Sequence, residues 1–157
     1  MNLRDGDQMA DIDILRASLL SATHSPGNES ESSYVLAVTE KGYGKRISID
    51  EFRTQRRGGK GVIAIKFKEK AGGGGKSSRV EGKLKGESDA LRCMRVCGPG
   101  DEVVLSTVRG TIVRQGVDSV SVQSRSATGV RIQKISVDDS IVCVDILPRE
   151  SPLAVVV

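Results

Sequence analysis

The residues best suited to chemistry in this sequence form a run of seven that places three cations among three glycines. Between two apolar runs, at residues 34–38 and 62–67, the chain reads Gln55-Arg56-Arg57-Gly58-Gly59-Lys60-Gly61. Closely spaced cations on a glycine-rich turn make a compact positive surface, and the backbone N–H groups of such a turn can also face an anion. The run therefore predicts recognition of phosphate. The competing interpretation is a solvated basic turn, because many Arg and Lys clusters on turns only face water.

The composition indicates which kind of polyanion such a basic run would bind. The chain has 157 residues, enough for one domain with a modest core, and 38% are hydrophobic. It contains two Tyr, two Phe and no Trp, so few aromatic rings exist on which unpaired bases could stack. Residues 1–33 carry 2 basic and 6 acidic side chains (net −4), whereas residues 34–67 carry 8 basic and 3 acidic (net +5). Duplex backbone, bound by one basic face, is the favoured target.

Other classes of function find little support. No apolar run approaches the roughly 18 residues that cross a bilayer, and a start with four aspartates in residues 1–13 is unlike a targeting segment. His24 is the sole histidine and lies in a polar connection, so neither a metal site nor a catalytic Ser/His/Asp or Cys/His set can be assembled. Three cysteines without a secretory signal predict reduced thiols. We therefore expect no catalytic residue, no metal site and no cofactor in this chain.

An internal repeat frames the basic run. Moved by 68 positions, residues 34–67 fall without a gap on residues 102–135, with ten of the 34 positions identical. A shorter motif recurs three times, starting at Asp7, Asp89 and Asp139. A period near 50 residues with about four strand-like runs per unit is typical of radially repeated β-sheets, as in propeller blades.

The repeat predicts an all-β chain of two propeller-like blades plus the closing strand of a preceding one. The predicted segments are the closing strand at 1–15, a flexible linker at 16–33, a first blade at 34–101 with a Gly-rich insertion at 68–86, a second blade at 102–147 and a tail at 148–157. Alternation predicts a half-buried strand with Ala10, Ile12 and Ile14 on its inner side.

The cysteines are predicted to be structural. Cys93 and Cys143 take equivalent places in the repeat, so each is expected to pack between units. Cys93 and Cys97 would lie about 13 Å apart along a strand, too far for a disulfide.

The basic run in its repeat resembles a known family. The similarity lies in Lys41-Gly42-Tyr43-Gly44-Lys45-Arg46, in the heptad followed by Val62, and in the later Gln123, Arg125, Thr128, Gly129 and Val130. These residues resemble the C-terminal domain of the gyrase A protein of DNA gyrase, and the heptad matches its "GyrA box" pattern. The resemblance covers roughly residues 3–148 and implies a β-pinwheel, a propeller-like ring of about six blades whose basic rim wraps duplex DNA, with the last two blades present here.

The resemblance also implies a function. The chain would be a DNA-binding and DNA-wrapping module that supports ATP-dependent negative supercoiling by a type II topoisomerase, and no enzyme by itself, since the breakage-reunion domain with its tyrosine is absent. Its partners would be the duplex DNA backbone, the remainder of gyrase A and gyrase B, and no membrane. It would lie with the genome, in a bacterial cytoplasm or in a chloroplast or mitochondrion. The expected DNA contacts are Gln55, Arg56, Arg57, Gly58, Gly59, Lys60 and Gly61, extended by Lys45, Arg46, Arg53 and Arg125.

Departures from the family pattern leave an alternative open. The full box belongs to the family's first blade, whereas here it lies in what would be the penultimate one. The second copy has Ser124 and Ser126 in place of Arg56 and Gly58, so it should bind DNA more weakly. Two blades also leave unpaired strand edges. The alternative is a truncated structural fragment, or a protein-interaction module, without independent DNA wrapping.

Overall fold

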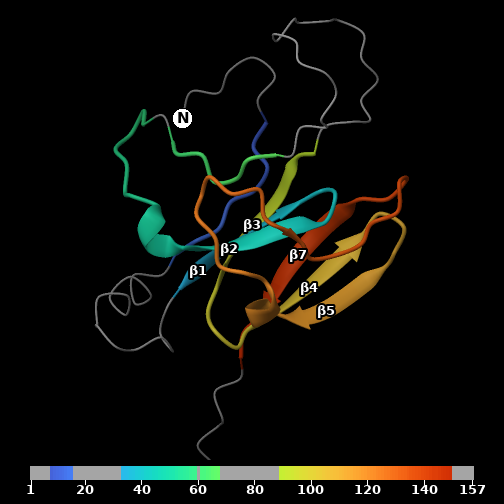
Figure 1. Ribbon diagram of the computed structural model, residues 1–157. Helices are drawn as coiled ribbons and strands as arrows, with labels where there is room; N and C mark the ends of the chain where they lie inside the picture. The colour runs from blue at the N-terminus through green and yellow to red at the C-terminus, as the bar shows by residue number, and fades with distance from the viewer. Residues whose placement is uncertain (1–7, 16–32, 60, 68–88, 150–157) are drawn as a thin grey trace, which may run out of the picture.

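The structure is a computed structural model that describes residues 8–15, 33–59, 61–67 and 89–149 (Figure 1). The predicted linker, apart from Ser33, lies outside the described residues, as do the Gly-rich insertion, most of the tail, Lys60 and His24. Regular structure in the described part is β-strand apart from two short 3-10 turns, which confirms the all-β prediction. No helix among these residues has the length and apolar character needed to cross a bilayer.

The described residues form seven strands in two antiparallel sheets. The elements are β1 (Tyr34–Thr39), β2 (Tyr43–Ser48), η2 (Ile49–Glu51), β3 (Leu91–Cys97), β4 (Glu102–Thr107), β5 (Ile112–Gly116), η3 (Val117–Ser119), β6 (Val130–Arg131) and β7 (Ile141–Leu147). One sheet has the order β3-β1-β2-β6 and the other β5-β4-β7. Figure 1 shows the two sheets beside each other, with β3 against β7 where they meet.

The sequence repeat is reproduced in the backbone. β1 pairs with β2 and β3 as β4 pairs with β5 and β7, and each central strand has an irregularity before its final threonine. The hydroxyls of Thr39 and Thr107 each accept an N–H from four residues ahead at 3.2 Å. Gly42 and Gly110 turn the two hairpins at φ of 79° and 83°, a region that favours glycine. The internal repeat is therefore confirmed as two copies of one supersecondary unit.

The main apolar core of the described residues lies between the two sheets. It combines branched side chains of the middle strands β1 and β4 with Val117 of η3 and Val120 just after it, so both units contribute to it. The buried members are Leu36, Val38, Cys93, Cys97, Val103, Leu105, Val117, Val120, Ile141 and Val144. Because both units contribute to this cluster, the two blades stabilise one another.

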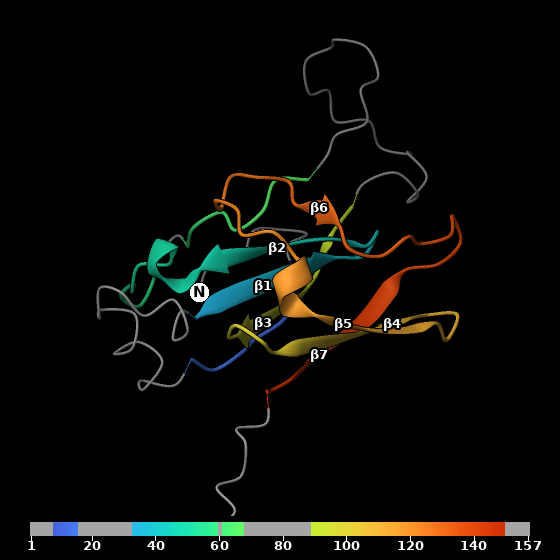
Figure 2. The same ribbon diagram turned by 60° about the horizontal axis from the view of Figure 1, so that its bottom comes forward.

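The second blade also reaches across to the first. Gln123 donates its N–H to the carbonyl of Arg46 at 2.8 Å, and Arg46 donates its own N–H to Ser121 at 3.1 Å. Further along, β6 pairs with β2 through Tyr43 and Gly44. Figure 2 shows this segment, in orange, running along the outer side of β2. Residues 121–131 therefore add a strand-like edge to the sheet of the preceding blade.

The segment at residues 8–15 differs from its prediction. It forms no β-strand, and its apolar side chains face outward, with Ile12 79% and Ile14 82% exposed. The carboxylates of Asp11 and Asp13 instead accept N–H groups of Met94 and Val96 on β3, at 3.1 and 2.8 Å. The half-buried strand was therefore a wrong prediction, because side-chain oxygens rather than a backbone ladder satisfy the edge of β3.

The burial of the cysteines agrees only in part with the prediction. All three are free thiols, and Cys93 and Cys97 are buried in the core as expected for packing residues. Cys143, at the position equivalent to Cys93, is exposed, so the prediction that it packs between units is wrong here. The reason is positional: β3 lies against β7, whereas β7 has no further blade beside it in the described residues.

Candidate nucleic-acid interface

The described residues of the box turn, 55–59 and 61, form a compact loop, and the side chain of its first residue bonds across it. Gln55 accepts the N–H of Gly61 on Oε1 at 3.0 Å, and Gly59 donates to the carbonyl of Arg56 at 3.1 Å. A Cβ on Gly59 would lie 2.5 Å from Gln55 Oε1, so only glycine fits there without a shift. Gly58 and Gly61 have φ of 76° and 74°. The glycines and Gln55 thus shape the loop, which leaves surface contact to the cations.

Three predicted DNA contacts are free at the surface. Arg53, Arg56 and Arg57 are exposed. Within the described residues no carboxylate lies in ion-pair range of any of them. Unpaired guanidinium groups keep their full charge and can each donate two parallel hydrogen bonds to a phosphate. This turn therefore has the chemistry to bind duplex backbone without reading bases.

Lys45 was expected to extend the basic track, and the structure places it in the interior instead. Its side chain is 0% exposed. Nζ donates to the carbonyls of Ser124, Arg125 and Ala127 at 2.6, 2.8 and 2.9 Å. Burial lowers the pKa of Lys45 from its ordinary value. The prediction of a DNA contact is wrong for this residue, because all three ammonium donors are used to hold the turn of the second blade.

Arg46 is likewise removed from the surface. It is 8% exposed, donates from Nε to the carbonyl of Val120 at 2.8 Å, and pairs through Nη1 with Asp118 at 2.5 Å. Its guanidinium also lies 5.1 Å from the centre of the Tyr34 ring. Arg46 therefore joins the first blade to η3 of the second, and its predicted place on the DNA track is corrected.

Arg125, in the second copy of the turn, is only partly available. Its N–H donates to Glu51 Oε2 at 3.0 Å, its Nε lies 3.7 Å from the same oxygen, and Nη1 donates to the carbonyl of Ile63 at 3.3 Å. The Glu51 carboxylate offsets its charge, so Arg125 contributes less to a positive surface than the three free arginines.

Lys66, an exposed cation beside the turn of the second blade, was not among the predicted contacts. It lies with Arg125 and Ser124 around a cleft of about 180 Å³, and its N–H donates to Ala127 at 3.2 Å. The signal for it was present, because Lys66 and Lys134 form one of the identical pairs of the repeat. The structure therefore brings Lys66 beside the turn of the second blade.

The fold and the surface together define a repeated, propeller-like β module that carries an exposed basic turn. The family model described as "DNA gyrase C-terminal domain, beta-propeller" matches residues 33–72 and 101–147, more than half of the chain. The chain belongs to this family, which confirms the resemblance found in the sequence.

Relatives and solved structures agree with this assignment. The gyrase A protein of Synechocystis sp. is 36% identical over 94% of this chain, and that of Deinococcus deserti is 32% identical over 98%. The chain spans only 17% and 16% of the length of these two relatives. A structure of a DNA gyrase A C-terminal domain has a TM-score of 0.56 at 26% identity, covering 74% of this chain and 34% of that chain. The C-terminal domain of a DNA topoisomerase IV, at 21% identity and a TM-score of 0.54 over 73% and 30%, supports the fold.

Proposed function

We propose that this chain is a DNA-binding and DNA-wrapping module of a gyrase-type topoisomerase. The observation that carries the proposal is a set of three exposed arginines on or beside the box turn, Arg53, Arg56 and Arg57, none of which pairs with a carboxylate in the described part of the chain. Family membership supports the same function. The module binds and bends duplex DNA through its phosphates and does not itself break a DNA strand.

The physics of wrapping suits this surface. Bending a site of 20–30 base pairs smoothly costs on the order of 1–6 kcal/mol, which several phosphate contacts offset. A rigid β-scaffold with charged turns supplies such contacts without contacts to base edges. In this role the module would present wrapped DNA to the remainder of gyrase A and to gyrase B, and so support ATP-dependent negative supercoiling. It would lie with the genome of a bacterium or of an organelle.

The two turns are proposed to contribute unequally. The second has Ser124 and Ser126 where the first has Arg56 and Gly58, and the charge of its Arg125 is offset by Glu51. DNA contact should therefore concentrate on the first turn, with Lys66 as its nearest addition towards the second.

The test is equilibrium binding to duplex DNA across a salt series, with the protein at nanomolar concentration. The variant Arg53→Ala/Arg56→Ala/Arg57→Ala should reduce the slope of log K against log salt by about 2.7, at ~0.9 per phosphate contact. The matched control is Arg114→Ala, whose guanidinium is already paired with Glu102. It should change the slope by well under one unit. Equal slopes for parent and triple variant would mean that the box turn is only solvated and that the proposal is wrong.

A further inference from the structure

The turn of the second blade, residues 123–129, keeps the backbone form of the box turn, which it repeats at the spacing of 68. The N–H of Ala127 donates to the carbonyl of Ser124 at 3.1 Å, and the equivalent bond of the box turn has the same length. Arg125 stands at the place of Arg57. The turn shape that is proposed to bind phosphate is therefore present twice.

An anionic group from the first blade occupies this second turn. Glu51, in η2, accepts the backbone N–H of Arg125 on Oε2 at 3.0 Å. The same oxygen lies 3.7 Å from Nε of Arg125. A backbone N–H and a guanidinium that face one oxygen are the arrangement by which a basic turn holds a phosphate. The Glu51 carboxylate therefore lies where an external anion would bind.

The carboxylate fills this place incompletely. At 3.7 Å the Nε group of Arg125 makes no hydrogen bond to Glu51, and within the described ranges this buried N–H has no other acceptor. A buried donor without an acceptor is unfavourable and calls for an explanation. A phosphate has oxygens in several directions, so it could accept both the backbone N–H and Nε–H of Arg125. The unused donor thus indicates a site shaped for a larger anion than a carboxylate.

Further donors line the same cleft, whose volume is about 180 Å³. Lys66, Ser124 and Ser126 lie around it together with Arg125 and Glu51. The hydroxyl oxygens of the two serines are 3.2 Å apart, so one hydroxyl donates to the other and one proton of the pair is left for a ligand. A water molecule takes about 30 Å³ in the liquid, so the cleft has room for a phosphate group.

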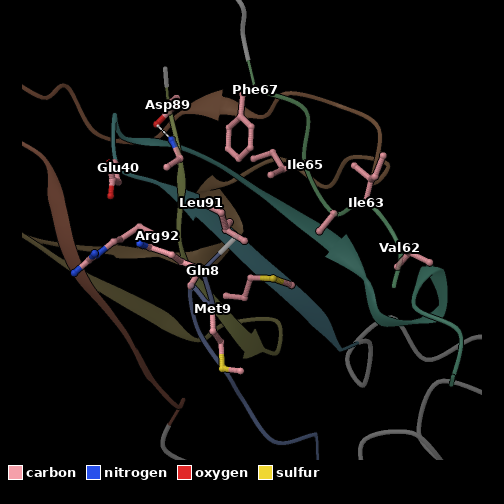
Figure 3. A pocket seen from close by; sticks show the side chains of 14 residues that line it. Gln8, Met9, Glu40, Val62, Ile63, Ile65, Phe67, Asp89, Leu91 and Arg92 are labelled. Atoms are coloured by element: carbon pink, nitrogen blue, oxygen red, sulfur yellow. Dashed lines mark hydrogen bonds between the residues drawn. The ribbon is translucent and has the colours of Figure 1, made fainter. Parts of the chain in front are cut away.

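A larger hollow beside the segment that carries Lys66 lacks this chemistry. Figure 3 shows Ile63 among the side chains that line it, and its volume is about 680 Å³. Its charged side chains are the carboxylates of Glu40 and Asp89 and the guanidinium of Arg92. Because two carboxylates face one cation there, this hollow does not attract an anion. The small cleft is the better anion site of the two.

The repeat separates the two partners of the ion pair. Arg125 repeats Arg57, whereas Ser119 stands at the place of Glu51. The Ser119 hydroxyl donates to the carbonyl of Gly116 at 2.7 Å, within its own blade. Both short 3-10 turns form, η2 with a carboxylate and η3 with a hydroxyl at this position. The scaffold therefore does not require the carboxylate, whose effect lies in what it contacts on the second blade.

We propose that the turn of the second blade is a phosphate-binding site that the Glu51 carboxylate occupies and thereby keeps closed to the DNA backbone. The inference rests on the proposed function in one respect, that the phosphate belongs to duplex DNA. The buried side chain of Ile49 anchors η2, so the carboxylate stays beside Arg125 and competes with external anions at high effective concentration. Removing its charge should open a second phosphate contact.

The first experiment is equilibrium binding of the full 157-residue chain to duplex DNA across a salt series. Glu51→Gln keeps an oxygen that can accept the N–H of Arg125 and removes the charge. Its slope of log K against log salt should be steeper than that of the parent by about 0.9, the value of one added phosphate contact. The matched control is Asp50→Asn, which removes the same charge from the adjacent exposed residue, whose carboxylate is bonded to Ser48. It should leave the slope unchanged.

Arg125→Ala shows whether the added contact is made by this arginine. Combined with Glu51→Gln, it should return the slope to the parent value, although the double variant has the same net charge as the parent. Arg125→Ala in the parent should change the slope by less than half as much as it does beside Glu51→Gln. This non-additivity distinguishes a direct contact from a general effect of charge.

Inorganic phosphate, titrated without DNA, tests the site separately from the proposed function. In the Glu51→Gln variant the amide resonance of Arg125 should shift in nitrogen-15 spectra and saturate at millimolar phosphate. In the parent the affinity should be at least about tenfold weaker. Chloride at the same ionic strength should leave this resonance unshifted. The same spectra show that the variant is folded.

Three results would overturn the proposal. The first is an equal slope for Glu51→Gln and a parent that binds DNA. The second is a steeper slope that Arg125→Ala does not cancel, which places the added contact elsewhere. The third is a folded Glu51→Gln variant that binds phosphate no more tightly than the parent, which leaves the carboxylate a role in the scaffold only. If phosphate affinity rises in this variant but no DNA is bound, the anion site stands and the proposed function is wrong.

Discussion

Replacing Lys45 with methionine tests whether this cation belongs to the scaffold or to the DNA surface. Methionine keeps the length of the side chain and removes the ammonium, which leaves the carbonyls of Ser124, Arg125 and Ala127 without their donor. Hydrogen bonds to charged groups contribute about 1.5–3 kcal/mol each in protein interiors. Two effects reduce the net loss: water reaches part of this turn, and burial of the ammonium in the parent costs desolvation free energy. We therefore expect a net loss of about 3 kcal/mol in the free energy of unfolding.

Urea denaturation at neutral pH measures this loss directly. The control is Lys134→Met, which removes an exposed cation from the same blade-to-blade segment and should cost less than about 0.5 kcal/mol. The salt slope of DNA binding should be unchanged in the folded Lys45 variant, because the ammonium contacts no phosphate. A stability within ~0.5 kcal/mol of the parent, together with a slope lower by ~0.9, would refute the scaffold role and restore Lys45 to the DNA surface.

Two further predictions concern the buried thiol of Cys97 and the close backbone approach at Gly129. Burial raises the pKa of Cys97 to about 12 from 9.0, so the unfolded chain loses this proton first. The free energy of unfolding should therefore fall by about 1.4 kcal/mol per pH unit above pH 9, and urea titrations of Cys97→Val should lack that part of the fall. Gly129→Ala should lower the free energy of unfolding by about 2–3 kcal/mol, since φ is 82° and the new Cβ would meet the Gly44 carbonyl. Gly110→Ala, with a similar φ and open space, should cost only about 1 kcal/mol, and equal losses would contradict the close approach.

The sequence predicted the architecture because repetition is visible without knowledge of long-range contacts. Ten identical positions at a spacing of 68 specified two copies of one hairpin unit, and the hairpin registers agree. The exposed basic turn was also predictable, because the shape of the loop depends on its own glycines and not on long-range contacts.

The burial of Lys45 and Arg46 could not be predicted from the local sequence. Adjacent residues of a strand point to opposite faces, so at least one of two neighbouring cations normally reaches solvent. Both are buried here because residues 120–127, more than 70 positions away, cover the strand edge. The same limitation applies to residues 8–15, where Asp11 found backbone donors on β3 that no alternation pattern reveals.

Lys45, which enters the turn of the second blade, also affects the path that a bound DNA duplex would take. The turn of the second blade is fixed by hydrogen bonds to β2 and by Lys45, so its position follows the neighbouring strand rather than its own loop. The register of a strand pair can change only by a whole number of residues. The smallest change that keeps each side chain on the same face of the sheet is two residues, about 6.8 Å. The spacing from the turn of the first blade to the turn of the second therefore changes only in such steps, and substitutions in the loops would alter affinity for DNA without altering that spacing.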